Sequence, residues 1–95
     1  MEIIKWLQEW VAESCDVNWE HSEGVKIFTL DNPGWKVDIT LEGTIAEGKQ
    51  FTPIKIERSE MDWIHCNVQD RTFRGFCGID NLNELLLIFK EWIES

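Results

Sequence analysis

Every second residue from Trp35 to Leu41 is apolar, and the residues between them are polar or charged. This period of two predicts a β-strand over Trp35–Glu42 with one buried side and one solvent-facing side. Pro33 and Gly34 precede the strand and suit the central positions of a type II turn, in which the glycine takes a positive φ. Such a turn would set the register of the strand and direct Trp35 into the core.

Four further segments have the composition and spacing of strands. They are Val25–Leu30, Phe51–Arg58, Asp62–Gln69 and Arg71–Cys77. The first of them is apolar on both sides, so one side could meet a second copy of the chain or be covered by a helix. Pro53 has no N–H to donate to a ladder, so its end of the strand is expected at a sheet edge or a bulge.

Two segments, one near each end of the chain, have the apolar spacing of amphipathic helices. The first covers Glu2–Ser14 and the second extends from Leu82 to Ile93. Asn81 can cap the second helix, and Glu84 three residues later predicts a capping box. The segment between residues 15 and 24 is rich in loop-forming residues and breaks the helical period.

These elements predict an α+β fold in a single domain of residues 1–95. Strands joined without intervening helices favour an antiparallel meander of four or five strands. Both helices would pack on one face of the sheet, and the other face would stay open to solvent. The polar residues expected on that open face are Lys36, Asp38, Thr40, Glu42, Lys55 and Glu57.

The net charge of −9 narrows the class of partner. Nucleic acids and anionic membranes would repel the chain, whereas a basic protein would be attracted. The amino terminus has no basic start, long apolar run or cleavage site, so no signal peptide is expected. No apolar run approaches the roughly 20 residues of a membrane span, and a cytosolic location is therefore predicted.

The soft ligands of the chain do not have the spacing of a metal site. Cys15, His21, His65, Cys66 and Cys77 include no C-x-x-C or H-x-x-x-H pair. His65 and Cys66 are adjacent in a predicted strand and would point to opposite faces, which argues against a nucleophile and base pair. A long-range pair of Cys77 with His21 stays open. We expect no metal, no cofactor and no catalytic residue.

One pattern offers an enzymatic alternative. The segment from Cys66 to Arg71 resembles the active loop of rhodanese-type sulfurtransferases, in which an arginine follows the cysteine five positions later. That loop is an anion cradle, whereas this segment reads as strand and turn, has no glycine and carries Asp70 inside the cradle. The alternative function is a small thiol enzyme of sulfurtransferase type that uses Cys66.

The tryptophans divide into core and surface candidates. Trp35 and Trp92 lie on predicted apolar stripes and are expected in the core. Trp63 shares the polar face of its strand with His65 and Asn67. An exposed tryptophan beside carboxylates is typical of an interface anchor, although it can also simply cover part of a sheet.

The chain resembles the immunity protein 53 family of bacterial polymorphic toxin systems. The resemblance rests on the order and spacing of "WLQEW", "CDVNWEH", "GVKIFTLDNPGWKVDITLEGT", "DWIHCNV" and "FRGFCGIDNLNELLLIFKEW" from residue 6 to residue 92. It implies a cytosolic antitoxin that binds a cognate toxin domain and blocks its active surface. It implies no catalytic or metal-binding residue.

The predicted toxin-binding residues lie on the open face of the sheet, with Trp63 as the apolar anchor. The acidic residues expected around it are Asp38, Glu42 and Glu57. A second predicted patch is the loop of Trp19, Glu20 and His21. The expected partner is a toxin domain, for which the charge favours a basic protein, and the chain itself is expected to be a monomer or a weak homodimer.

Overall fold

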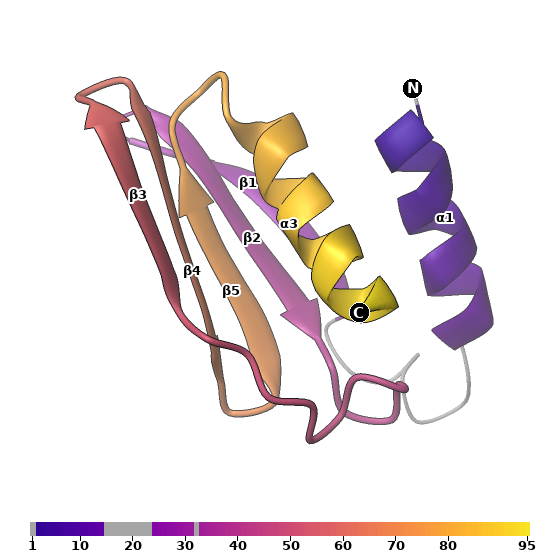
Figure 1. Cartoon of the computed structure of the whole chain (residues 1–95). Coiled ribbons are helices and arrows are strands. Elements are labelled where there is room, and N and C mark those ends of the chain that lie inside the picture. Colours follow the sequence, from indigo (N-terminus) through magenta and orange to yellow (C-terminus); the bar gives the residue numbers. More distant parts are fainter. Residues whose placement is uncertain (1, 15–23, 32) are drawn as a thin grey trace.

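The computed structural model describes residues 2–14, 24–31 and 33–95 and contains two helices and five strands in these ranges (Figure 1). The elements are α1 (Glu2–Ser14), β1 (Val25–Leu30), β2 (Gly34–Thr40), β3 (Ile54–Ser59), β4 (Asp62–Gln69), β5 (Thr72–Cys77) and α3 (Leu82–Glu94). Both helices cover the same face of the sheet (Figure 1). The predicted α+β class, with a helix near each end of the chain and an antiparallel sheet between them, is confirmed.

The five strands form one antiparallel sheet in the order β1-β2-β5-β4-β3. The predicted meander is therefore wrong in one respect, because β3 lies at the far edge and does not pair with β2. The connection over residues 41–53 carries the chain to that edge. It is not a tight turn, since Leu41 and Ala46 are buried in the core and Phe51 packs against it. The strand β5 then returns between β2 and β4.

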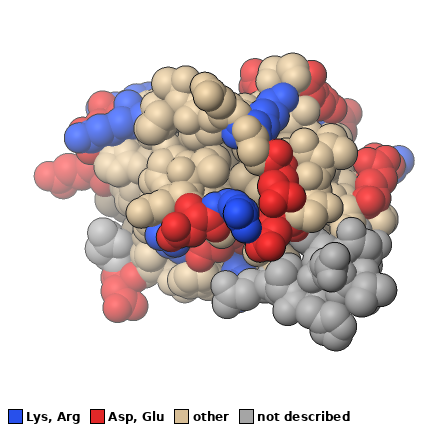
Figure 2. Space-filling view, turned by 90° about the horizontal axis from the view of Figure 1, so that it is seen from below, with Lys and Arg blue, Asp and Glu red and all other residues tan. Residues whose placement is uncertain are grey.

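The end of the sheet beside this connection carries paired charges. Arg71, at the turn between β4 and β5, lies 3.6 Å from a carboxylate oxygen of Glu42 and 3.9 Å from one of Glu47. Arg74 lies 3.7 Å from Asp70. Figure 2 views the molecule from this end and shows acidic and basic side chains side by side near its centre. Acidic charge at this end is therefore partly compensated.

The turn between β1 and β2 sets the register of β2 as expected, but the glycine in it is needed for a different reason. Gly34 does not take a positive φ, so the predicted type II turn is wrong, and Gly34 is the first residue of β2. A Cβ on Gly34 would lie 2.4 Å from the carbonyl oxygen of Cys77, so this position needs glycine because the backbones approach closely. The predicted register holds, because Val37 and Ile39 are buried and Trp35 packs against the core.

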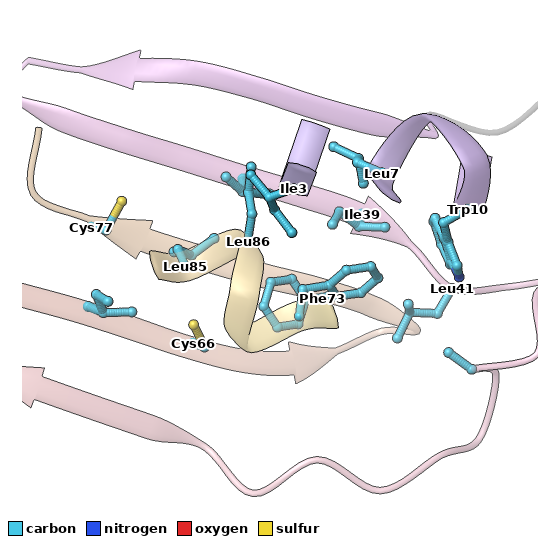
Figure 3. Close-up of a cluster of buried hydrophobic side chains, with 14 residues drawn as sticks. Ile3, Leu7, Trp10, Ile39, Leu41, Cys66, Phe73, Cys77, Leu85 and Leu86 are labelled. Atoms are coloured by element: carbon cyan, nitrogen blue, oxygen red, sulfur yellow. The ribbon is translucent and has the colours of Figure 1, made fainter. Parts of the chain in front are cut away.

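The core lies between the sheet and the two helices. Phe73 of β5 is at its centre, with its ring centroid 4.9 Å from that of Phe89 on α3. Figure 3 shows Leu85 and Leu86 of α3 beside Phe73, with side chains of α1 alongside them. The helix α3 can approach this closely because Gly75 of β5 has no side chain: a Cβ there would lie 2.7 Å from Cδ1 of Leu85.

Asn81 precedes α3 but does not cap it in the predicted way. Its side chain makes no capping hydrogen bond to the helix. It is buried, donates from Nδ2 to Oδ1 of Asp62 at 2.9 Å and accepts from the backbone N–H of Trp63 at 3.3 Å. The predicted capping box is wrong because Glu84 binds Arg58 instead. Asn81 thus fixes the start of α3 to the hairpin of β3 and β4.

Candidate functional site

The face of the sheet away from the helices is open and combines aromatic with charged side chains. Neighbouring strands place Phe28, Lys36, Phe76, His65 and Lys55 in one row across it, because these residues pair in register. Phe28, on the edge strand β1, is 47% exposed. An open face of an antiparallel sheet is normally polar. Exposed aromatic rings on such a face are typical of a surface that binds a partner.

A shallow groove of about 690 Å³ crosses this open face. Its floor is apolar and aromatic, and one rim is the charged end of β3 with the turn that follows it. The lining residues are Leu30, Trp63, His65 and Phe76 in the floor and Glu57, Arg58, Ser59 and Glu60 in the rim. Gly34 pairs with Leu30 and has no side chain, so β2 adds nothing that would fill this part of the face.

Trp63 is held at the centre of a small polar and aromatic cluster. It is the cross-strand partner of Glu57, and its ring centroid lies 5.3 Å from that of His65. Nε2 of His65 lies 3.1 Å from Oε2 of Glu57. These contacts restrict the three side chains in advance, and a pre-ordered surface loses less entropy when a partner binds.

Two cations of the open face and its rim, Lys36 and Arg58, already have acidic partners. Lys36 forms an ion pair with Asp38, and its Nζ lies 4.5 Å from the ring centroid of Phe76. Arg58 donates to Asp62 at 2.7 Å and to Glu84 at 2.5 Å. The hydrogen bond from Arg58 lowers the pKa of Glu84, whereas hydrogen bonds from Asn81 and then Arg58 lower the pKa of Asp62.

The turn between β3 and β4 and the connection from β5 to α3 meet at the end of the sheet where the groove opens. Trp35 Nε1 donates to the carbonyl of Ile79 at 2.9 Å, and the N–H of Gly78 donates to the carbonyl of Trp63 at 3.0 Å. The carboxylates at this end are Asp31, Glu57, Glu60, Asp62, Asp80 and Glu84, with Arg58 as the cation among them. Among the described residues, Asp31, Glu60 and Asp80 have no ion-pair partner. Three of the six carboxylates at this end therefore have no compensating cation among the described residues.

The structure brings only some of the predicted binding residues together. Glu57 and Trp63 are adjacent on the open face. Asp38 is on the same face, but β5 lies between its strand and that of Trp63, and Lys36 pairs with it. Glu42 follows the end of β2, which is shorter than predicted, and lies beside Arg71 at the other end of the sheet. The predicted patch of Trp19, Glu20 and His21 lies outside the described residues.

Sequence reasoning missed two contributors to the groove floor, Leu30 and Phe76. Both were within predicted strands, and the period of two places Phe76 on the side opposite Phe73 and Cys77. Extending that alternation across β5 would have indicated an exposed aromatic residue. The sequence could not show that both residues lie near Trp63, because their proximity depends on the position of β5 between β2 and β4.

The two described thiols, Cys66 and Cys77, are buried and do not form a reactive site. Cys66 is 2% exposed on the helix-covered side of β4, and burial, with the nearby Cys77, raises its pKa to about 12. Burial likewise raises the pKa of Cys77 to about 11. Arg71 lies at the exposed tip of the hairpin, where it and Asp70 take φ values of 58° and 53°. The segment is thus a buried strand and a two-residue turn, not an anion cradle, and the sulfurtransferase alternative gains no support.

The described part of the chain contains no group of three or more side chains suited to holding a metal ion. In the same residues, neither helix combines the length and the apolar character needed to cross a membrane.

Comparison with known proteins gives one family. The family model described as "Immunity protein 53" matches residues 4–94 of the 95-residue chain. No curated protein and no solved structure matches the chain significantly.

Proposed function

The chain belongs to the Immunity protein 53 family, and on that premise we propose that it is an antitoxin that binds a cognate bacterial toxin domain. It would neutralise the toxin by covering the toxin's active surface and would perform no chemistry of its own. The family match over residues 4–94 is the observation that carries this proposal. The expected setting is the cytoplasm of a bacterium that produces a polymorphic toxin.

The proposed toxin-binding surface is the open face of the sheet around Trp63. Phe28, Phe76 and Trp63 offer aromatic area there, and Asp38 and Glu57 lie on the same face. Tryptophan is prominent among the few residues that dominate interface energies, and surrounding polar contacts exclude water from it. Among the described residues, the aromatic side chains on the helix-covered face pack in or against the core and leave less aromatic surface there.

The charge of the chain supports a basic toxin surface as the partner. A net charge of −9 accelerates encounter with a basic protein and makes the association rate fall as salt is added. We expect the antitoxin to act as a monomer or a weak homodimer.

Co-expression with the toxin domain encoded beside its gene tests the function. Cells that express the toxin domain should survive only when the antitoxin is present, and the two purified proteins should form a complex. A pair that neither rescues growth nor associates would refute the antitoxin proposal.

Two truncations to alanine test the surface separately. Trp63→Ala should weaken the complex by about 2 kcal/mol or more, as for a central anchor. Leu87→Ala is the matched control, because Leu87 is 38% exposed on α3, on the opposite face of the molecule. If the control weakens binding and Trp63→Ala does not, the antitoxin uses the helix face and the proposed surface is wrong.

A further inference from the structure

We propose that the groove on the open face receives a cationic side chain, an arginine or lysine, from the bound toxin. This inference rests on the proposed antitoxin function and names the chemistry that the surface recognises. It depends on the groove's aromatic floor, its acidic rim and the fact that Arg58, the cation that lines the groove, already has acidic partners.

One aromatic residue of the groove, Phe76, already contacts a cation of the chain itself. Nζ of Lys36 lies 4.5 Å from the centroid of Phe76, within the range of a cation–π interaction. Trp63, the aromatic residue with the strongest attraction for cations, lines the same groove. Among the described residues, no cation lies over the ring of Trp63, so that ring is available to a cation from a partner.

The rim supplies negative charge at the place where such a cation would sit. Glu57 and Glu60 both line the groove. Among the described residues, Glu60 has no ion-pair partner, and the carboxylate of Glu57 has one hydrogen-bond partner, His65. A carboxylate beside an aromatic ring suits a guanidinium, which stacks on the ring and donates hydrogen bonds to the carboxylate.

In the part of the chain that the structure describes, no cation fills this position. Arg58 lines the groove, but its guanidinium is turned to Asp62 and Glu84. Lys36 is paired with Asp38. Lys55 lies two positions before Glu57 on the same face but does not line the groove.

Apolar residues beside the rim favour a protein partner over a free ion. Met61 and Ile79, in the turn and the connection that meet at this end, are 57% and 43% exposed. A protein that inserts a basic side chain could cover both and exclude water from the groove, which strengthens the charge interaction.

The first experiment needs no toxin. N-acetyl-arginine amide is titrated into the isotope-labelled protein, and the indole N–H resonance of Trp63 is followed by NMR. The neutral isostere N-acetyl-citrulline amide serves as the control ligand. Arginine amide should shift the Trp63 resonance in a saturable way and citrulline amide should not. Equal shifts from both, or shifts confined to the other end of the sheet, would overturn the proposal.

The second experiment uses matched charge variants with the toxin domain. Glu57→Gln with Glu60→Gln removes two charges at the groove, and Glu42→Gln with Glu47→Gln removes two beside Arg71. The groove variant should weaken the complex about tenfold or more and the control only slightly, because truncating one member of a close charge pair mainly raises the dissociation rate. Equal losses, or none in the groove variant, would contradict the inference.

The two experiments separate the two proposals. If the wild-type protein does not bind the toxin domain, the antitoxin proposal fails, and the arginine titration still decides whether the groove takes a cation. If the toxin binds but the titration and the charge variants show no preference at the groove, the antitoxin proposal stands and the cation site is refuted.

Discussion

The guanidinium of Arg58 binds both carboxylate oxygens of Glu84, with Nη1 3.1 Å from Oε1 and Nη2 2.5 Å from Oε2. Arg58 belongs to the edge strand β3, and Glu84 belongs to the first turn of α3 on the other side of the sheet edge. Asp62 completes the contact at 2.7 Å from Nη1. This fork joins the β3–β4 hairpin, which carries the rim of the groove, to the helix layer.

Replacing Arg58 should change how stability depends on pH. The fold lowers the pKa of Glu84 and Asp62, so the unfolded chain binds more protons than the folded chain in acid. Their contribution is present above the ordinary carboxyl pKa of about 4 and is lost as pH falls through the lowered values. Arg58→Gln should lower the urea midpoint at pH 7, and the gap to wild type should narrow below about pH 4.

Lys55→Gln is the control for this prediction, because it removes the same charge from the same strand. Lys55 has no ion pair with a described residue, so its variant should keep the acid sensitivity of the wild type. A gap between Arg58→Gln and wild type that is constant down to strong acid would contradict the role assigned to the fork.

The same contact shows why one part of the local prediction failed. Asn81 and Glu84 have the spacing of a capping box, and α3 begins at the expected place. The side chains are used otherwise, because Arg58 and Asp62 lie far from them in sequence and reach them only when the hairpin packs against the helix. The local pattern predicted where α3 begins, whereas long-range contacts decided what its first polar residues bind.

The approach of Leu85 to Gly75 predicts a strong coupling between the two positions. A Cβ at residue 75 would meet three carbons of Leu85, the nearest at 2.7 Å. Gly75→Ala alone should cost about 1–3 kcal/mol through overpacking. Leu85→Ala alone should cost about 2–5 kcal/mol through the cavity that it leaves. The double variant should cost less than the sum by about 1 kcal/mol or more, because the new methyl occupies part of that cavity.

Equilibrium unfolding in urea measures these costs. Gly75→Ala combined with Leu86→Ala is the control pair, because Leu86 is equally buried on α3 but is not among the atoms nearest to the added methyl. Its two effects should add. Strict additivity in the Leu85 pair would show that α3 does not pack on β5 at Gly75.

Burial of Cys66 predicts slow alkylation in the native protein. With a pKa raised to about 12, the thiol is almost wholly protonated at pH 8, and the helices cover it. Iodoacetamide should label Cys66 only as fast as the protein unfolds, and urea should accelerate the reaction. A Cys15→Ser background and peptide mass spectrometry would assign the signal. If Cys66 is labelled quickly in the native protein, with an apparent thiol pKa below the usual value of about 8.5, the result would support the thiol-enzyme alternative.

Most of the fold could be predicted from sequence, but the groove could not. The period of two located β1 and β4 to the residue, and it placed Trp63 beside His65 on the open face. The strand order could not be read from it, because residues 41–53 form a long connection and not a tight turn. No local pattern therefore predicts that Leu30 and Phe76 line the same groove as Trp63. For the same reason, the pattern does not show that Glu42 lies at the opposite end of the sheet, beside Arg71.

The turn between β4 and β5 predicts a stabilising substitution. Arg71 takes a φ of 58°, a left-handed conformation that costs a residue with a side chain about 1–2 kcal/mol. Asp70 tolerates the same region, and Asp-Gly is the preferred pair for such a two-residue hairpin. Arg71→Gly should therefore raise the free energy of unfolding by about 0.5–1 kcal/mol, after allowance for the greater freedom of glycine in the unfolded chain. The ion pairs that it removes, at 3.6 and 3.9 Å, are exposed and contribute little.

Arg71→Ala is the control, because it removes the same ion pairs but keeps the strained backbone. In urea unfolding at pH 7, its free energy of unfolding should be lower than that of Arg71→Gly. The reverse order would show that the ion pairs contribute more than the strain costs.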